Sequence, residues 1–207
     1  MNNEAPRLRI YPINPLVKNR SADVSEFVDP QTGEKVIIVE RGEYDDELVA
    51  YTALKNSNLP VFESAFDADC VRYHVPRGTE TIRNYMPKIT EHLQKEMINE
   101  READLFMPFV ELGKLLGKLQ ENNIRFDSRD NILDKIALAP DFSGRYGLQN
   151  FLIPPYDFTI KPDDYGNLDH CLSELRGLRL HKAEHQHLVN SLMVGFLQQL
   201  MYEPTRS

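Results

Sequence analysis

Three oxygen-bearing side chains in the second half of the sequence are of the types that bind hard metal ions or accept protons. Asp127 and Asn131 lie in a short polar stretch, and Asp157 lies farther along in the sequence Tyr-Asp-Phe-Thr. Carboxylate and amide oxygens are the hard ligands that magnesium prefers, and a carboxylate can also accept the proton of a hydroxyl group. We therefore consider Asn131 and Asp157 as metal ligands and Asp127 as a group that accepts a hydroxyl proton or orients a nucleophile. The structural alternative is that Asp127 and Asn131 brace a turn and Asp157 caps the next element.

A predicted helix leads into this polar stretch. From Met107 onward apolar residues recur at spacings of three and four, and Asn122-Asn123 ends the pattern. Two apolar runs follow, at 132–138 and 151–153, and predict a hairpin whose end delivers Asp157. The apolar stripe of the helix consists of Phe109, Leu112, Leu115, Leu116 and Leu119.

The first part of the chain is rich in predicted strands. Residues 24–40 predict a hairpin, because proline and glycine occupy the turn Asp29–Gly33 where turns favour them. Residues 43–57 predict a helix with acidic residues in its first turn and Lys55 near its end. Further strands are predicted at 8–11, 61–66 and 70–75.

The second part is mostly helical. Pro76-Arg77-Gly78 interrupts the strands, 79–100 predicts a polar helix, and 168–201 predicts two helices with an apolar stripe near the end. We therefore expect an α+β protein of two lobes in one compact unit. Residues 1–78 would form a small antiparallel sheet with one helix, and residues 79–207 a mostly helical lobe.

This order of elements resembles the protein-kinase-like fold. Val36–Arg41 resembles the strand that carries the phosphate-binding lysine of that family, and Glu47 resembles the helix glutamate that pairs with the lysine. The lysine position falls near Glu40 or Arg41, with Lys35 as a possible substitute. Residues 71–86 resemble the hinge strand and the segment entering the second lobe. The resemblance implies that Lys35, Arg41 and Glu47 lie on the nucleotide side of the site.

The catalytic segments resemble those of the family in order but not in every residue. Asp127–Asn131 resembles the catalytic loop, and Tyr156–Thr159 resembles the metal-binding segment. The family's histidine and aspartate positions hold Ile124 and Phe126, its metal-segment glycine is Thr159, and no glycine-rich loop precedes Val36.

The resemblance implies ATP and magnesium as cofactors of a kinase-like protein with a reduced site. Its length is similar to that of small bacterial kinase-related proteins. We expect weak or absent ATP-dependent phosphotransfer and a regulatory role. The alternative is a binding scaffold, a pseudokinase that takes no nucleotide. We expect a protein partner, and for the scaffold the acidic helix 91–104 and the segment 76–87 would be the candidate contact regions.

Two other groups of residues suggest different chemistry. His181 to His185 fits H-x-x-E-H, a zinc pattern of metalloproteases in which Glu184 would act as base. Little sequence follows in which to find a third ligand, so we expect an exposed helix face rather than a zinc site. Cys70 and Cys171 have no CxxC partner. A Cys–His nucleophile pair at 170–171 is an alternative to a buried thiol, which we favour.

Composition excludes several classes of partner. The formal net charge is −8, which argues against a nucleic-acid surface. No apolar stretch approaches the roughly 20 residues needed to span a bilayer, and the first residues lack the apolar core of a signal peptide. We expect a cytoplasmic protein, or one delivered into a host cell as an effector. The pattern gives no oligomeric state.

Overall fold

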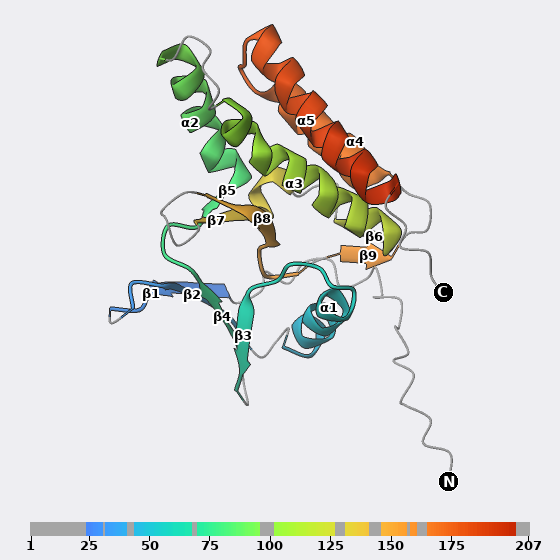
Figure 1. Ribbon diagram of the computed structural model, residues 1–207. Helices are drawn as coiled ribbons and strands as arrows, with labels where there is room; N and C mark the ends of the chain where they lie inside the picture. The colour runs from blue at the N-terminus through green and yellow to red at the C-terminus, as the bar shows by residue number, and fades with distance from the viewer. Residues whose placement is uncertain are drawn as a thin grey trace.

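The computed structural model describes residues 24–30, 32–40, 44–67, 70–95, 102–126, 131–140, 146–156, 158–160 and 165–201 (Figure 1). Among the residue predictions, the strand at 8–11 and the side chains of Arg41, Asp127 and Asp157 lie outside these ranges.

A four-stranded antiparallel sheet forms the first part of the protein, in the order β1-β2-β4-β3. Helix α1 connects β2 to β3 and packs beside the sheet (Figure 1). The β1–β2 hairpin closes through Gly33, whose φ of 71° suits glycine, and α1 is followed by Asn58 with a φ of 53°. The elements are β1 Val24–Val28, β2 Lys35–Glu40, α1 Tyr44–Asn56, β3 Glu63–Phe66 and β4 Cys70–Val75.

Helices dominate the second part, together with two small sheets. One sheet has the order β5-β7-β8, and the other is the two-stranded ladder β6-β9. The elements are β5 Glu80–Thr81, α2 Ile82–Lys95, α3 Glu102–Glu121, β6 Ile124–Phe126, the short 3-10 helix η2 Ile132–Asp134, β7 Ile136–Pro140, β8 Tyr146–Leu152, β9 Phe158–Ile160, α4 Gly166–Gly177 and α5 Lys182–Met201.

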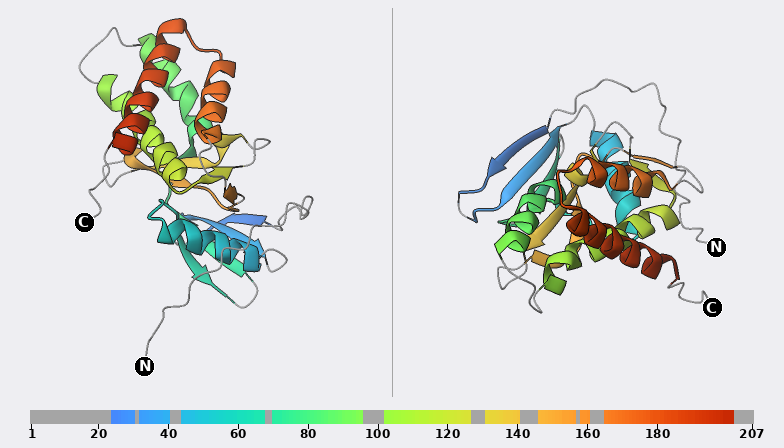
Figure 2. Two further views of the ribbon diagram at one scale, coloured as in Figure 1. Left: turned by 90° about the vertical axis from the view of Figure 1, so that its right-hand side faces the viewer. Right: turned by 90° about the horizontal axis from the view of Figure 1, so that it is seen from above.

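Helices α3 and α5 pack against each other with their backbones in close contact. A Cβ atom added to Gly195 would lie 1.8 Å from the carbonyl oxygen of Val110, and one added to Gly113 would lie 2.0 Å from that of Leu192. Only glycine fits at both positions, because any side chain would overlap the neighbouring backbone. The apolar stripe predicted for α3 is buried along its whole length, so α3 is the central helix of this part (Figure 2).

The two parts meet at β8 and at the loop before β3. The N–H of Leu152 donates to the carbonyl of Pro60 at 2.9 Å, and Val61 forms an isolated bridge with Leu152. The rings of Phe62 and Phe151 stack with centroids 5.2 Å apart. These contacts tie the sheet-bearing part to the helical part beside α3.

The predicted fold class is confirmed: the protein is α+β, with a small antiparallel sheet and several helices in two parts. The hairpin at 24–40 and the helix predicted at 43–57 are present with small shifts at their ends. Helix α3 begins at Glu102, earlier than the periodicity indicated. Strands β6 and β9 were not predicted. The boundary at 78 and 79 stays a prediction.

None of the helices in the described part of the chain is both long and apolar enough to cross a membrane.

Candidate functional site

Glu47 is a buried carboxylate that joins the sheet-bearing part to the segment before Asp157. The residue is 4% exposed on α1. The hydroxyl of Tyr73 donates to its Oε1 atom at 2.6 Å, and the backbone N–H of Tyr156 donates to its Oε2 atom at 2.9 Å. A buried carboxylate needs such donors, because leaving it without them costs its full desolvation free energy. Glu47 thereby fixes the backbone that leads directly into Asp157.

Tyrosine rings surround this carboxylate. The ring centroid of Tyr73 lies 5.9 Å from that of Tyr51 and 5.5 Å from that of Tyr156. Burial, followed by the charge of Glu47, raises the pKa of Tyr73 far above its usual value, and the same two causes raise the pKa of Tyr156. Both phenols therefore stay protonated at neutral pH, and Tyr73 remains a hydrogen-bond donor.

Lys35 lies at the start of β2 and contacts a different carboxylate. Its Nζ atom is 2.6 Å from Oε2 of Glu26 on the neighbouring strand, and both side chains are about half exposed, at 43% and 51%. An exposed ion pair of this kind contributes little to stability.

The ladder β6–β9 brings together the two chain segments that flank the predicted acids. Ile124 pairs with Ile160, Arg125 with Thr159, and Phe126 with Phe158. Asp127 follows Phe126 in the sequence, and Asp157 precedes Phe158. Residues far apart in the sequence that flank the two acids are thus direct partners across one ladder.

Asn167, near the start of α4, holds β6 in place. It is 6% exposed, its Oδ1 accepts from the N–H of Phe126 at 3.0 Å, and its Nδ2 donates to the carbonyl of Ile124 at 2.7 Å. The side chain makes the two backbone hydrogen bonds that a further strand would make. Helix α4 thereby fixes the strand that enters the polar loop.

Asn131 leaves that loop with its side chain exposed. The residue precedes η2 with φ −73° and ψ 110°, and its carbonyl accepts from the N–H of Asp134 at 3.0 Å. Its side chain makes no capping hydrogen bond to η2. The amide therefore does not cap η2, and its oxygen is available to a ligand.

The other candidate groups have structural roles. The N–H of His181 donates to Oε2 of Glu184 at 3.1 Å, so Glu184 stabilises the start of α5. Within the described ranges, no group of three or more His, Cys, Asp or Glu side chains could hold a metal ion. Cys171 is fully buried, and burial raises the pKa of its thiol well above the usual value, whereas Cys70 is partly exposed on β4.

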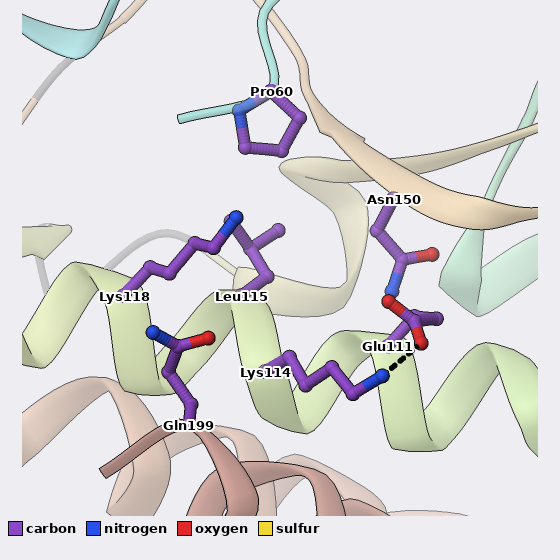
Figure 3. Close-up of a pocket in the computed structure, with 7 residues that line it drawn as sticks. All are labelled: Pro60, Glu111, Lys114, Leu115, Lys118, Asn150 and Gln199. Atoms are coloured by element: carbon purple, nitrogen blue, oxygen red, sulfur yellow. Dashed lines mark hydrogen bonds and ion pairs between the residues drawn. The ribbon is translucent and has the colours of Figure 1, made fainter. Parts of the chain in front are cut away.

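A pocket of about 460 Å³ lies at the junction of the two parts, away from the predicted residues. Figure 3 shows Lys114 paired with Glu111, at 2.6 Å, and Lys118 on the next turn of α3. Seven residues line the pocket: Pro60, Glu111, Lys114, Leu115, Lys118, Asn150 and Gln199. None of them is a residue that the sequence predicted for the site.

Sequence reasoning missed Tyr73 and Asn167. Tyr73 alternates with Val71 and Val75 on the buried face of β4, where a tyrosine looks like an ordinary core residue. For Asn167 the sequence held a weak indication. The residue lies next to Leu168 on the buried side of α4, and a polar side chain at a buried position usually has a hydrogen-bonding role.

Comparisons with known proteins agree with this geometry at the level of the fold. No family model matches the sequence, and no curated protein matches it. Among solved structures, the chain is similar to WaaP in a structure described as "WaaP in complex with acyl carrier protein". The TM-score is 0.50 with 10% sequence identity, over 86% of this chain and 79% of that one. The likeness supports a distant kinase-like fold.

Proposed function

We propose that this chain is a kinase-like regulatory protein with a reduced site, which binds magnesium nucleotide weakly and transfers phosphate slowly or not at all. Asn131 and Asp157 would hold the metal, and Asp127 would face the acceptor hydroxyl. Lys35, Arg41 and Glu47 would lie on the nucleotide side. The lobes would be residues 1–78 and 79–207.

The observation that carries the proposal is the β6–β9 ladder. Its partners Phe126 and Phe158 are the sequence neighbours of the two candidate acids. Asn131 adds an exposed amide that η2 does not use. Oxygen ligands of this kind suit magnesium, which commonly takes one or two protein oxygens and the phosphates of its substrate.

The β1–β2 turn supports weak rather than strong nucleotide binding. The N–H of Gly33 donates to the carbonyl of Asp29, and the N–H of Asp29 donates to that of Glu34, both at 2.8 Å. A phosphate cradle needs free N–H groups that point at the anion, and these two are used within the turn. Lys35 is in turn partly neutralised by Glu26.

A binding scaffold without nucleotide is the second candidate, and an exposed apolar stripe on α5 favours it. Val194 and Leu197 are each 49% exposed and Met201 is 82% exposed. Their spacing of three and four places them on one face of the helix, where a protein partner could cover them. The described complex of WaaP with a carrier protein is consistent with a protein partner for this fold.

Thermal unfolding with and without about 10 mM magnesium ATP separates the two candidates, because a ligand that binds the native state raises its stability. We expect a small stabilisation of the wild type, on the order of 0.5–1 kcal/mol, because a ligand near its dissociation constant shifts stability by about RT ln 2 or somewhat more. Asp157→Ala should abolish the stabilisation. Asp169→Ala, which removes an exposed carboxylate from α4, should keep it. No stabilisation of the wild type would refute nucleotide binding and leave the scaffold.

A further inference from the structure

Glu174 on α4 holds the chain directly after Asn131. Its side chain is 10% exposed, and its Oε1 atom accepts a short hydrogen bond from the backbone N–H of Ile132. We propose that Glu174 is a positioning residue, which fixes the peptide between Asn131 and Ile132 and so sets where the Asn131 side chain points. This inference rests on the proposed function, in which Asn131 is a metal ligand.

Both oxygens of Glu174 are occupied, so the carboxylate has one defined orientation. Arg83 of α2 donates through Nη2 to Oε2 at 2.5 Å, and His170 Nε2 lies 3.2 Å from Oε1. Arg83 also donates through Nε to Oδ2 of Asp134 at 2.8 Å. A charged group with several partners is held more firmly than one with a single partner.

The same cluster holds the far side of η2. Asp134, bound by Arg83, donates its own N–H to the carbonyl of Asn131. Two hydrogen bonds therefore restrain the backbone at Asn131: Glu174 accepts from the N–H of Ile132, and the carbonyl of Asn131 accepts from the N–H of Asp134. These restraints act on the backbone, while the Asn131 side chain itself makes no capping contact.

Helix α4 contacts both ends of the polar loop. Asn167 binds the strand that enters it, and Glu174 binds the residue that leaves it. The two are seven residues apart, which is close to two helical turns, so they project from the same face of α4. Helix α4 thus holds both the β6–β9 ladder and the residue that follows Asn131.

The position of the Asn131 side chain should affect magnesium affinity more strongly than it affects the stability of the fold. Magnesium demands near-ideal octahedral geometry at roughly 2.0–2.1 Å, so a ligand displaced by a fraction of an ångström binds less well. Residues that orient a metal ligand commonly change metal affinity by about 10–100-fold when they are replaced.

The experiment uses Mn²⁺ as the probe, because its paramagnetism broadens the NMR signals of groups near it. We expect Mn²⁺ to broaden the side-chain amide signal of Asn131 in the wild type. Glu174→Met, which has no acceptor for the N–H of Ile132, should raise the Mn²⁺ concentration needed for this broadening by about tenfold or more. The control variant Asp169→Ala removes an exposed carboxylate from the same helix, outside this cluster, and it should keep wild-type broadening.

Each result decides between the two proposals. Broadening that is absent in the wild type would overturn the proposed function and, with it, this inference. Broadening that is equal in the wild type and Glu174→Met would overturn the inference alone. Should Glu174→Met fail to fold, Glu174→Asp provides a second variant, because it keeps the charge for Arg83 but is too short to reach Ile132. It should lose affinity to a similar extent, and undiminished broadening in it would equally refute the positioning role.

Discussion

Replacing Tyr73 by phenylalanine should destabilise the protein by about 2 kcal/mol, because hydrogen bonds to charged groups contribute roughly 1.5–3 kcal/mol. The substitution removes one oxygen atom and leaves the ring. In the folded protein that oxygen donates to Oε1 of Glu47 at 2.6 Å, in a site where Tyr73 is 0% and Glu47 4% exposed. Water cannot replace the lost donor without opening the core, so the carboxylate bears most of the cost.

Urea and thermal unfolding measure this loss. For a domain of about 200 residues, 2 kcal/mol corresponds to a fall in Tm of about 4–8 °C. The matched control is Tyr165→Phe, which removes a hydroxyl from a side chain that is 52% exposed and should change stability by less than about 0.5 kcal/mol.

A double-mutant cycle tests the mechanism. If the hydrogen bond is the cause, Glu47→Leu, which removes the acceptor, and Tyr73→Phe should show a coupling free energy of about 1–3 kcal/mol when they are combined. A Tyr73→Phe variant as stable as the Tyr165→Phe control, or two substitutions whose effects simply add, would refute the assignment of Glu47 and Tyr73 as an energetically coupled pair.

Three further predictions concern other parts of the fold. Gly195→Ala should cost at least about 3 kcal/mol in unfolding experiments, since its Cβ would overlap the carbonyl of Val110, whereas Gly177→Ala, with nothing within 4 Å, should be neutral or stabilising. Burial raises the pKa of Cys171, so the unfolded chain loses this proton first and stability should fall above about pH 8.5 by up to about 1.4 kcal/mol per pH unit; urea unfolding from pH 7 to 10 measures the slope, which a Cys171→Ala variant should reduce. Asn167→Ala should cost about 2–4 kcal/mol by unpairing two buried backbone groups of β6, and faster amide exchange in β6 would accompany it; unchanged exchange would contradict the role of this amide.

The sequence by itself determined the elements whose stabilising contacts are local. A turn such as Asp29–Gly33 forms from neighbouring residues, and its hydrogen bonds run within the turn. The leucines of α3 recur with the helical period, so their burial followed from spacing alone. The kinase-like order could be read for the same reason, since it is an order of locally defined elements.

The shortest strands could not be read in this way. β6 and β9 have three residues each, too few for an alternating pattern to stand out from chance. They exist because each is the partner of the other and because Asn167 closes the free side of β6. All of those contacts join residues that are far apart in the sequence, so a local sequence pattern cannot predict them.

Only the tertiary structure decided which polar groups meet. The sequence marked Glu47 as a candidate, but its donors come from 26 and 109 residues away, and Glu174 finds the N–H of Ile132 across 42 residues. A helix or a hairpin is favoured by interactions between near neighbours, and such interactions can be predicted from the sequence. A buried charge needs a partner, because desolvation makes an unpaired charge costly. The donors that lie within reach of that charge are determined only when the whole chain has packed.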